Sequence, residues 1–437
     1  MNEWIKKNFN LVLIIFILLG PILDMVTGII LHVFHVNITI GIIFRILFLI
    51  FVLYALIFVY KKKKHLYLYG ILILYGIFYI VGMLLYKDGV GIFSEIQGLA
   101  RVFYFPVLLI ALYDLRDEIK VTNMTLMVIL LTYLVCILVP NCLNIGFESY
   151  EITKKGSLGF FNSANEISGI ISILTPFMFL IFIKIKKVVP IIIISLLYLV
   201  VILSIGTKSP LLSLGITVFF IYLYFIYQEV KIKKYKIVFL SLIALLLFIG
   251  LLILVLPKTT FYKNIKTHLD FLEVDNITEV VKDKDLIDHF IFSQRLTFLE
   301  NRKEDYLNAS TYEKLFGIGY LEFGQEEKAV EMDYFDIYYS HGVVGFIIYF
   351  AIYGYIFYLI MKKREKLNIE KYCIYISIIL IILLSFITGH IITAPSVSIL
   401  VAIILLKVMP DKLRKAIKIK KKEKKGILTI KNMLNEV

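Results

Sequence analysis

The chain has 437 residues, of which 60% are apolar and 18% are charged, and its mean hydropathy is +0.87. Soluble domains carry roughly 25% charged residues, so this composition argues against an ordinary soluble domain. A formal net charge of +14 is compatible with nucleic-acid binding, but the distribution of that charge along the chain argues against it, as shown below.

Apolar runs near 20 residues recur along the chain, and that is the length a helix needs to cross the ~30 Å hydrocarbon core of a bilayer. Because a chain in lipid must satisfy its backbone hydrogen bonds internally, these runs are expected to be helices. We therefore predict an all-α polytopic membrane protein with about twelve (ten to twelve) transmembrane helices. The candidate spans, in chain order, are 10–32, 38–60, 65–86, 98–113, 122–142, 163–183, 188–206, 209–228, 237–256, 341–361, 372–390 and 394–410.

Lys and Arg are distributed unequally between the short segments that join these spans. If the N-terminus is cytoplasmic, the inner segments hold 31 of them and the short outer loops hold four. This positive-inside pattern predicts that both termini are cytoplasmic. The predicted organisation is a membrane domain with helices 1–9 (1–256), a large extracytoplasmic loop (257–340), helices 10–12 (341–410) and a basic cytoplasmic tail (411–437). We expect the tail to bind anionic lipid headgroups, and we expect no nucleic-acid partner.

Five ionisable residues fall in the outer half of a span or at its outer end. They are Asp24, Arg45, Arg101, Lys208 and His390. Charge inside a membrane is costly and usually faces a polar cavity. One interpretation is that Arg45 reaches the headgroups and Asp24 pairs with an arginine for packing. We favour a shared cavity open to the outside, because the charges gather at one depth. Arginine donors match phosphate oxygens, so this cavity suits an anionic lipid headgroup.

Two short motifs precede outward-starting spans. Gly159–Glu166 (GFFNSANE) contains Asn162 and Asn165, which either cap the next helix or contact substrate. Gly206–Pro210 (GTKSP) contains Lys208, and it is either an ordinary loop or part of the same polar surface. Proline suits the first turn of the helix that follows.

The predicted loop at 257–340 carries 17 Asp and Glu, 10 Lys and Arg and two His. Its first part, to about His289, is acidic, and we do not expect it to take part in chemistry. The second part contains Arg295 and the sequence LFGIG at 315–319, and it runs through the acidic segment 331–336 to His341. That acidic segment contains Glu331, Asp333 and Asp336.

The three acidic residues do not predict a metal site. Glu331 and Asp333 are two positions apart, so on a helix they would face different directions. We expect neither metal nor cofactor. His341, directly before a span, is either an interfacial residue or a catalytic one.

These motifs, in this order and placement, resemble the family of O-antigen ligases and O-antigen or capsular polysaccharide polymerases. The resemblance covers the whole architecture and rests on Gly159–Asn165, Thr207–Ser209, Arg295 with LFGIG, and Gly342–Gly345 (GVVG). Two positions differ from the ligase pattern. Lys208 stands where ligases usually have Arg, and Glu331 stands where they usually have His, which favours a polymerase.

The resemblance implies a reaction in which a hydroxyl of a growing glycan acceptor attacks the anomeric carbon of a polyprenyl-diphosphate-linked oligosaccharide. The lipid diphosphate then leaves. Preorganised cations can neutralise it without a metal, and a positioned carboxylate can take the hydroxyl proton. The candidate base is Glu331 or Asp333, with His341 in reserve. The candidate cations are Arg295, Arg101, Arg45 and Lys208, and further substrate contacts are expected from Asn162, Asn165 and Asp336.

Other partners implied are membrane lipids, a chain-length regulator and a flippase. Two other classes of function stay open, a transporter for lipid-linked sugars and a scaffold. Transporters are commonly built from two related halves, and a long loop after the ninth span breaks such a repeat. A scaffold would not need polar residues in several spans.

Overall fold

The structure is a computed structural model that describes residues 2–36, 39–86, 91–149, 156–185, 187–320, 330–364 and 366–410. The predicted basic tail, 411–437, lies outside the described residues. So do Lys87, Lys154 and Lys155, three of the four lysines counted in the outer loops.

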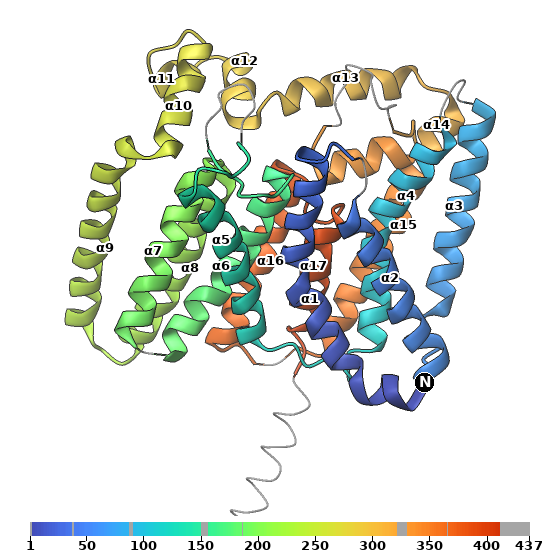
Figure 1. The fold of residues 1–437 in the computed structure, drawn as a ribbon, viewed down its shortest axis with the longest axis horizontal. Helices are drawn as coiled ribbons and strands as arrows, with labels where there is room; N and C mark the ends of the chain where they lie inside the picture. The colour runs from blue at the N-terminus through green and yellow to red at the C-terminus, as the bar shows by residue number, and fades with distance from the viewer. Residues whose placement is uncertain are drawn as a thin grey trace, which may run out of the picture.

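The described residues are helical and contain no β-strand, which confirms the predicted fold class. Twelve helices run back and forth between two faces of the molecule (Figure 1). They are α1 (Asn2–His32), α2 (Ile40–Tyr54, continued by the π-helical turn η1, Ala55–Val59), α3 (Leu66–Tyr86), α4 (Ile92–Asp114), α5 (Asn123–Cys142), α6 (Ala164–Ile185), α7 (Val188–Ile205), α8 (Lys208–Lys231), α9 (Tyr235–Val255), α15 (Asp333–Lys362), α16 (Ile369–Ile387) and α17 (Pro395–Leu406).

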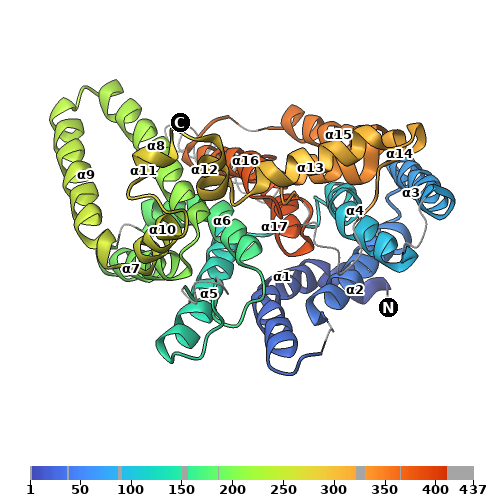
Figure 2. The same ribbon diagram turned by 90° about the horizontal axis from the view of Figure 1, so that it is seen from above.

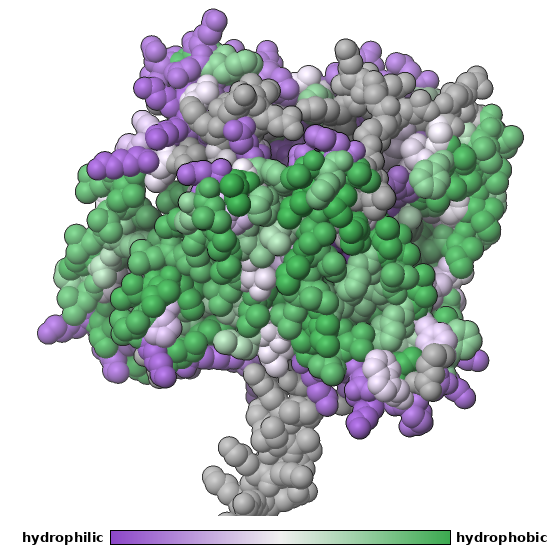
Figure 3. Space-filling model, viewed as in Figure 1, coloured by the Kyte–Doolittle hydropathy of each residue, from purple (hydrophilic) through white to green (hydrophobic). Residues whose placement is uncertain are grey.

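Eleven of the described helices are long and apolar enough to cross a membrane, and α17, with 12 residues, is shorter. Apolar side chains form a continuous band around the flank of the molecule, with polar residues at both ends (Figure 3). This is the surface expected of a chain whose flank faces lipid. Helix α9 has no buried residue and lies at the outer edge of the bundle.

Helix α17 lies in the centre of the bundle, where it packs against α4, α6 and α16. All its residues from Ser396 to Leu406 are buried. The segment 388–394 that leads into it is not helical, so the last span is part loop and part helix. Irregular backbone at membrane depth is tolerated where protein surrounds it.

A layer of short helices, here called the cap, covers one end of the bundle (Figures 1 and 2). It comprises η2 (Leu256–Lys258), α10 (Thr260–Phe271), α11 (Ile277–Val280), α12 (Lys284–Ile287), η3 (Asp288–Phe292), α13 (Arg295–Asn308) and α14 (Thr311–Phe316). Leu269, Val280 and Phe290 form a small apolar core of its own. The predicted loop is therefore an ordered helical layer for most of its length. Helix α15 starts at Asp333 rather than at the predicted 341.

Helix α15 is broken at Gly342, whose backbone (φ 66°, ψ −175°) is not helical. The break frees the carbonyls of Tyr339 and Ser340, which accept hydrogen bonds from the amides of Ile318 and Gly319 at 2.9 and 3.2 Å. The LFGIG segment therefore packs directly on the break. A Cβ at Gly342 would lie 2.5 Å from the backbone nitrogen of Gly317. The close approach of the LFGIG and GVVG segments therefore requires glycine at position 342.

Candidate functional site

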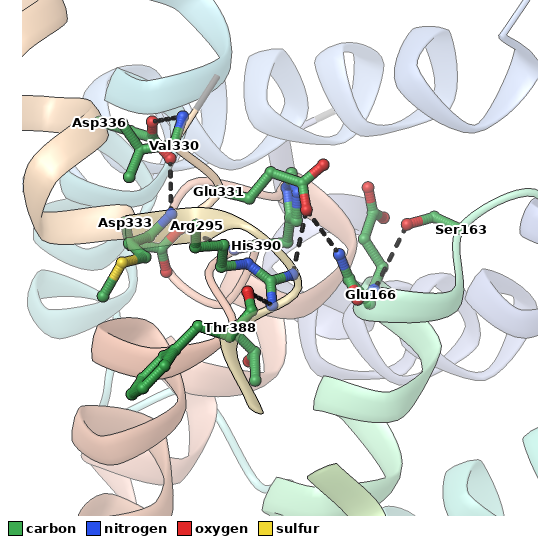
Figure 4. Close-up of polar contacts among 12 residues, drawn as sticks. Ser163, Glu166, Arg295, Val330, Glu331, Asp333, Asp336, Thr388 and His390 are labelled. Atoms are coloured by element: carbon green, nitrogen blue, oxygen red, sulfur yellow. Dashed lines mark hydrogen bonds and ion pairs between the residues drawn. The ribbon is translucent and has the colours of Figure 1, made fainter. Parts of the chain in front are cut away.

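Two arginine–glutamate pairs lie at the cap end of the bundle. The first joins Arg295, at the start of α13, to Glu331, just before α15 (Figure 4). Arg295 Nη2 donates to Glu331 Oε2 over 3.0 Å, and Asn165 Nδ2 donates to the same oxygen over 3.3 Å. The Arg295 side chain is 9% exposed and that of Glu331 is 36% exposed. Glu331 Oε1 accepts no hydrogen bond from the described residues and remains open to a ligand.

The guanidinium of Arg295 is only partly satisfied. Its Nη1 donates to the Phe292 carbonyl over 3.3 Å, but its Nε is buried with no partner among the described residues. A buried donor without a partner costs roughly 1–3 kcal/mol.

Arg295 is positioned by a carboxylate earlier in the cap. Asp288, at the start of η3, is buried, and its Oδ1 accepts from the Leu296 amide over 2.8 Å. Its Oδ2 accepts from the Thr297 amide and hydroxyl over 2.8 and 2.7 Å. These bonds satisfy amides in the first turn of α13, as an N-cap does. The acidic first part of the loop thus contributes directly to the placement of Arg295, which the sequence did not predict.

The second pair joins Arg101 of α4 to Glu166 in the first turn of α6. Arg101 Nη2 lies 3.9 Å from Glu166 Oε1 and 3.1 Å from His390 Nδ1. Glu166 Oε2 accepts a hydrogen bond from Ser396 Oγ of α17. Because a guanidinium can only donate, Nδ1 of His390 accepts this hydrogen bond and carries no proton.

The backbone is strained where these side chains attach. Ser293 and Gln294 before Arg295, Glu331 itself and His390 all have φ between 55° and 65°. Non-glycine residues rarely adopt this left-handed conformation, and each instance costs of order 1–3 kcal/mol. Such strain persists only where surrounding contacts impose it, and it clusters at functional sites.

Asp333 holds the non-helical segment before α17. Its carboxylate accepts from the amides of residues 390, 391 and 392 over 2.7, 2.9 and 2.9 Å, and from the Thr393 hydroxyl. Asp333 is fully buried. With both oxygens occupied by donors it is poorly placed to accept a proton from a substrate. The geometry favours a role in positioning His390.

Asp336 performs a similar task for Glu331. Its two oxygens accept from the amides of Val330 and Met332, each over 3.0 Å, so they hold the backbone on both sides of Glu331. Asp333 and Asp336 therefore position the site rather than line it. Among the described residues, no group of three or more His, Cys, Asp and Glu is arranged to hold a metal ion.

His341 lies in a different cluster, next to the break in α15. It is fully buried, with its Nδ1 3.2 Å from the Tyr75 hydroxyl and its Nε2 2.7 Å from the Tyr320 hydroxyl. Tyr320 is held by Glu95, whose carboxylate oxygens accept from its amide over 3.0 and 3.1 Å. Because both ring nitrogens of His341 are occupied, the geometry favours packing over catalysis.

Arg45 is neutralised within the bundle. Its Nη2 donates to Asp24 Oδ1 over 2.6 Å, and Tyr133 donates to Asp24 Oδ2 over 3.0 Å. Arg45 is 8% exposed. It lines a small cavity between α1, α2, α5 and α17, which also includes Tyr133 and Ser396. The packing interpretation therefore describes Arg45 better than a direct contact with the headgroup.

Lys208 and Asn162 contact residues outside the two arginine–glutamate pairs. The Lys208 ammonium donates to the Phe290 carbonyl of η3 and lies 4.4 Å from the centre of the Phe290 ring, so it ties the cap to α8. Asn162 Oδ1 lies 2.7 Å from Nε2 of His32 at the end of α1.

The structure brings together some of the predicted site residues and adds two that the sequence analysis did not predict. The fold brings together the predicted residues Arg295, Glu331, Arg101 and Asn165, from four separate parts of the chain. Two residues of the site, Glu166 and Asp288, were missed. Glu166 carried a signal, because it directly follows Asn165 in the GFFNSANE motif. Asp288 carried none, because no spacing rule links it to the helix that it caps.

The sequence matches the family model described as O-antigen ligase like membrane protein, over residues 6–289 and 278–413. No curated protein and no solved structure gives a significant match. The two matched ranges together run from residue 6, in the first turns of α1, to beyond the end of α17. They also include all four members of the two arginine–glutamate pairs.

Proposed function

The chain belongs to the family of O-antigen ligase like membrane proteins, and from this premise we propose that it transfers a glycan from a polyprenyl diphosphate at the outer face of the cytoplasmic membrane. It is a multi-pass bacterial membrane protein. The reaction we propose is the polymerisation of a surface polysaccharide of the O-antigen or capsule type, with lipid-linked oligosaccharide repeat units as donors. No metal or cofactor is required in this proposal.

The two arginine–glutamate pairs are the observation that carries the proposal. They gather two cations and two carboxylates from α4, α6, α13 and the loop before α15, at the end of a bundle whose flank is apolar. A lipid-linked substrate needs this arrangement, because its tail stays in the membrane while its diphosphate reaches the polar end. Arginine forks match phosphate oxygens and stabilise the charge of a leaving diphosphate.

Each residue of this site has a proposed role. Arg295 and Arg101 contact the diphosphate, and Arg101 has the more exposed side chain of the two, at 45% against 9%. A carboxylate, Glu331 or Glu166, takes the proton of the attacking hydroxyl. Asn165 supports Glu331 and, with Asn162, faces the sugars. Lys208 and Asp336 hold the cap and the Glu331 backbone in place.

The orientation proposed for the molecule places the cap outside the cytoplasm. The basic segments that contain Lys61–Lys64, Lys231–Lys236 and Lys362–Arg364 join helices at the opposite end, as the positive-inside pattern requires. A flippase that delivers lipid-linked units, and a regulator of chain length, are the partners that such a reaction would need.

Two alternative functions, a ligase and a transporter, would use the same lipid-linked substrate. A ligase would transfer the same glycan to a separate acceptor, and Glu331 at the position where ligases usually have His weighs against it. A transporter for lipid-linked sugars would not need a carboxylate with an open oxygen beside an arginine. Neither alternative is favoured by a specific contact in the described residues.

The proposal is tested by reconstituting the purified full-length chain with a polyprenyl-diphosphate-linked oligosaccharide. Growth of a glycan ladder on the lipid supports a polymerase, and transfer only to an added separate acceptor supports a ligase. If no lipid diphosphate is released with either acceptor, the protein is not a glycosyl transferase of this type.

A further inference from the structure

We propose that Glu166 is the catalytic base that takes the proton from the attacking hydroxyl, while Glu331 serves to hold Arg295. This inference rests on the proposed glycosyl transfer and gives a catalytic role to the last residue of the GFFNSANE motif. It follows from the different surroundings of the two carboxylates.

Glu166 is fixed in place but keeps one oxygen available. It lies in the first turn of α6, and the hydroxyl of Ser396 on α17 donates to its Oε2. Its Oε1 lies 3.9 Å from Arg101 Nη2, which is too long for a hydrogen bond. No described residue donates a hydrogen bond to Oε1. In Figure 4 the side chains of Glu166 and Glu331 face the same space from opposite sides.

Glu331 is poorly suited to gain a proton. Its Oε2 holds Arg295 Nη2, and the Arg295 side chain is 9% exposed. Protonation of Glu331 would remove the charge opposite a buried guanidinium, and an uncompensated buried charge is strongly unfavourable. The charge partner of Glu166 is Arg101, whose side chain is 45% exposed. Water can therefore solvate Arg101 when Glu166 becomes neutral.

The step is balanced without a further reactant. The oxygen of the acceptor hydroxyl forms a bond to the anomeric carbon, and the bond from that carbon to the diphosphate oxygen breaks. The electron pair of the broken bond leaves with the lipid diphosphate, next to Arg295. The hydroxyl proton passes to Glu166 Oε1, and the neutral acid then returns it to water at the exposed side of the site.

The test compares three variants of the full-length chain in the reconstituted release assay, namely Glu166→Gln, Ser396→Ala and Glu331→Gln. Loss of a general base lowers turnover by about 10²–10⁴-fold, so Glu166→Gln should show that loss while it binds the lipid-linked donor as the wild type does. Ser396→Ala removes the hydrogen bond that α17 donates to Glu166 but keeps the carboxylate, and it should lose no more than about tenfold. Glu331→Gln should weaken donor binding, because it releases Arg295.

Two results overturn the assignment. One is turnover by Glu166→Gln within about threefold of the wild type. The other is an equal loss in Ser396→Ala, which would make Glu166 a packing residue. These results are distinct from failure of the proposed function, in which the wild type itself releases no lipid diphosphate from the donor.

Discussion

Replacing Asp288 with alanine should damage the site without touching any of the residues proposed to contact substrate. The three hydrogen bonds that Asp288 accepts from Leu296 and Thr297 fix the first turn of α13, and Arg295 is the first residue of that helix. The variant removes the acceptor and leaves two amides at the helix start without their partner.

The size of the effect can be worked from these contacts. Loss of an N-cap costs about 0.5–2 kcal/mol, and hydrogen bonds to a charged group contribute about 1.5–3 kcal/mol each. Because the three bonds share one carboxylate and are not additive, we expect a loss of about 2–4 kcal/mol in the stability of the cap. A displacement of about 1 Å at Arg295 should lower turnover by about 100-fold.

The measurement is lipid-diphosphate release by reconstituted protein, together with its thermal unfolding in detergent. Asp283→Ala is the matched control. Asp283 lies in the same layer of short helices, where it is the N-cap residue of α12 and accepts from the amides of Asp285 and Leu286. It should leave release nearly unchanged. If Asp288→Ala and Asp283→Ala behave alike, Asp288 does not position Arg295 and the reasoning is wrong.

Three further substitutions test other parts of the fold and site. Gly342→Ala should lower the melting temperature markedly, because its Cβ would meet the backbone of Gly317; an unchanged melting temperature would contradict the break in α15. Asp333→Ala should reduce both stability and release, since it frees the segment that carries His390; full activity would show that this segment needs no anchor. Protonation of His390 Nδ1 would remove the acceptor of Arg101 Nη2 and place two cations side by side, so stability should fall as the pH drops into the acid range. His390→Asn should weaken this dependence in unfolding measured against pH, and an unaltered profile would refute it.

Hydropathy predicts most of the helices, because bilayer crossing depends on length and apolar composition alone. Where the prediction fails, the cause is a polar segment that is nevertheless ordered. Residues 333–340 are too polar to read as part of a span, yet they are helical because Asp336 holds the backbone before them and α14 packs on them. The predicted span 372–390 ends earlier, at Ile387, because Asp333 accepts from the amides of residues 390 and 391 in place of helical carbonyls.

The candidate site was only partly predictable for a related reason. Arg295 and Glu331 stand out because they lie in recognisable motifs, and the fold pairs them. Arg45 stands out equally as an intramembrane charge, yet it forms an ion pair with Asp24 inside the bundle. Whether a charged residue faces a partner or a substrate depends on contacts between distant elements, which local patterns do not encode.

The most direct test is the release of polyprenyl diphosphate from a lipid-linked oligosaccharide by the purified, reconstituted chain and by its Arg295→Ala variant. The wild type should release the lipid diphosphate as the glycan is transferred, and Arg295→Ala should be nearly inactive at equal expression and folded yield. Release by Arg295→Ala at the wild-type rate would contradict the proposed role of this arginine and of the pair that it forms with Glu331.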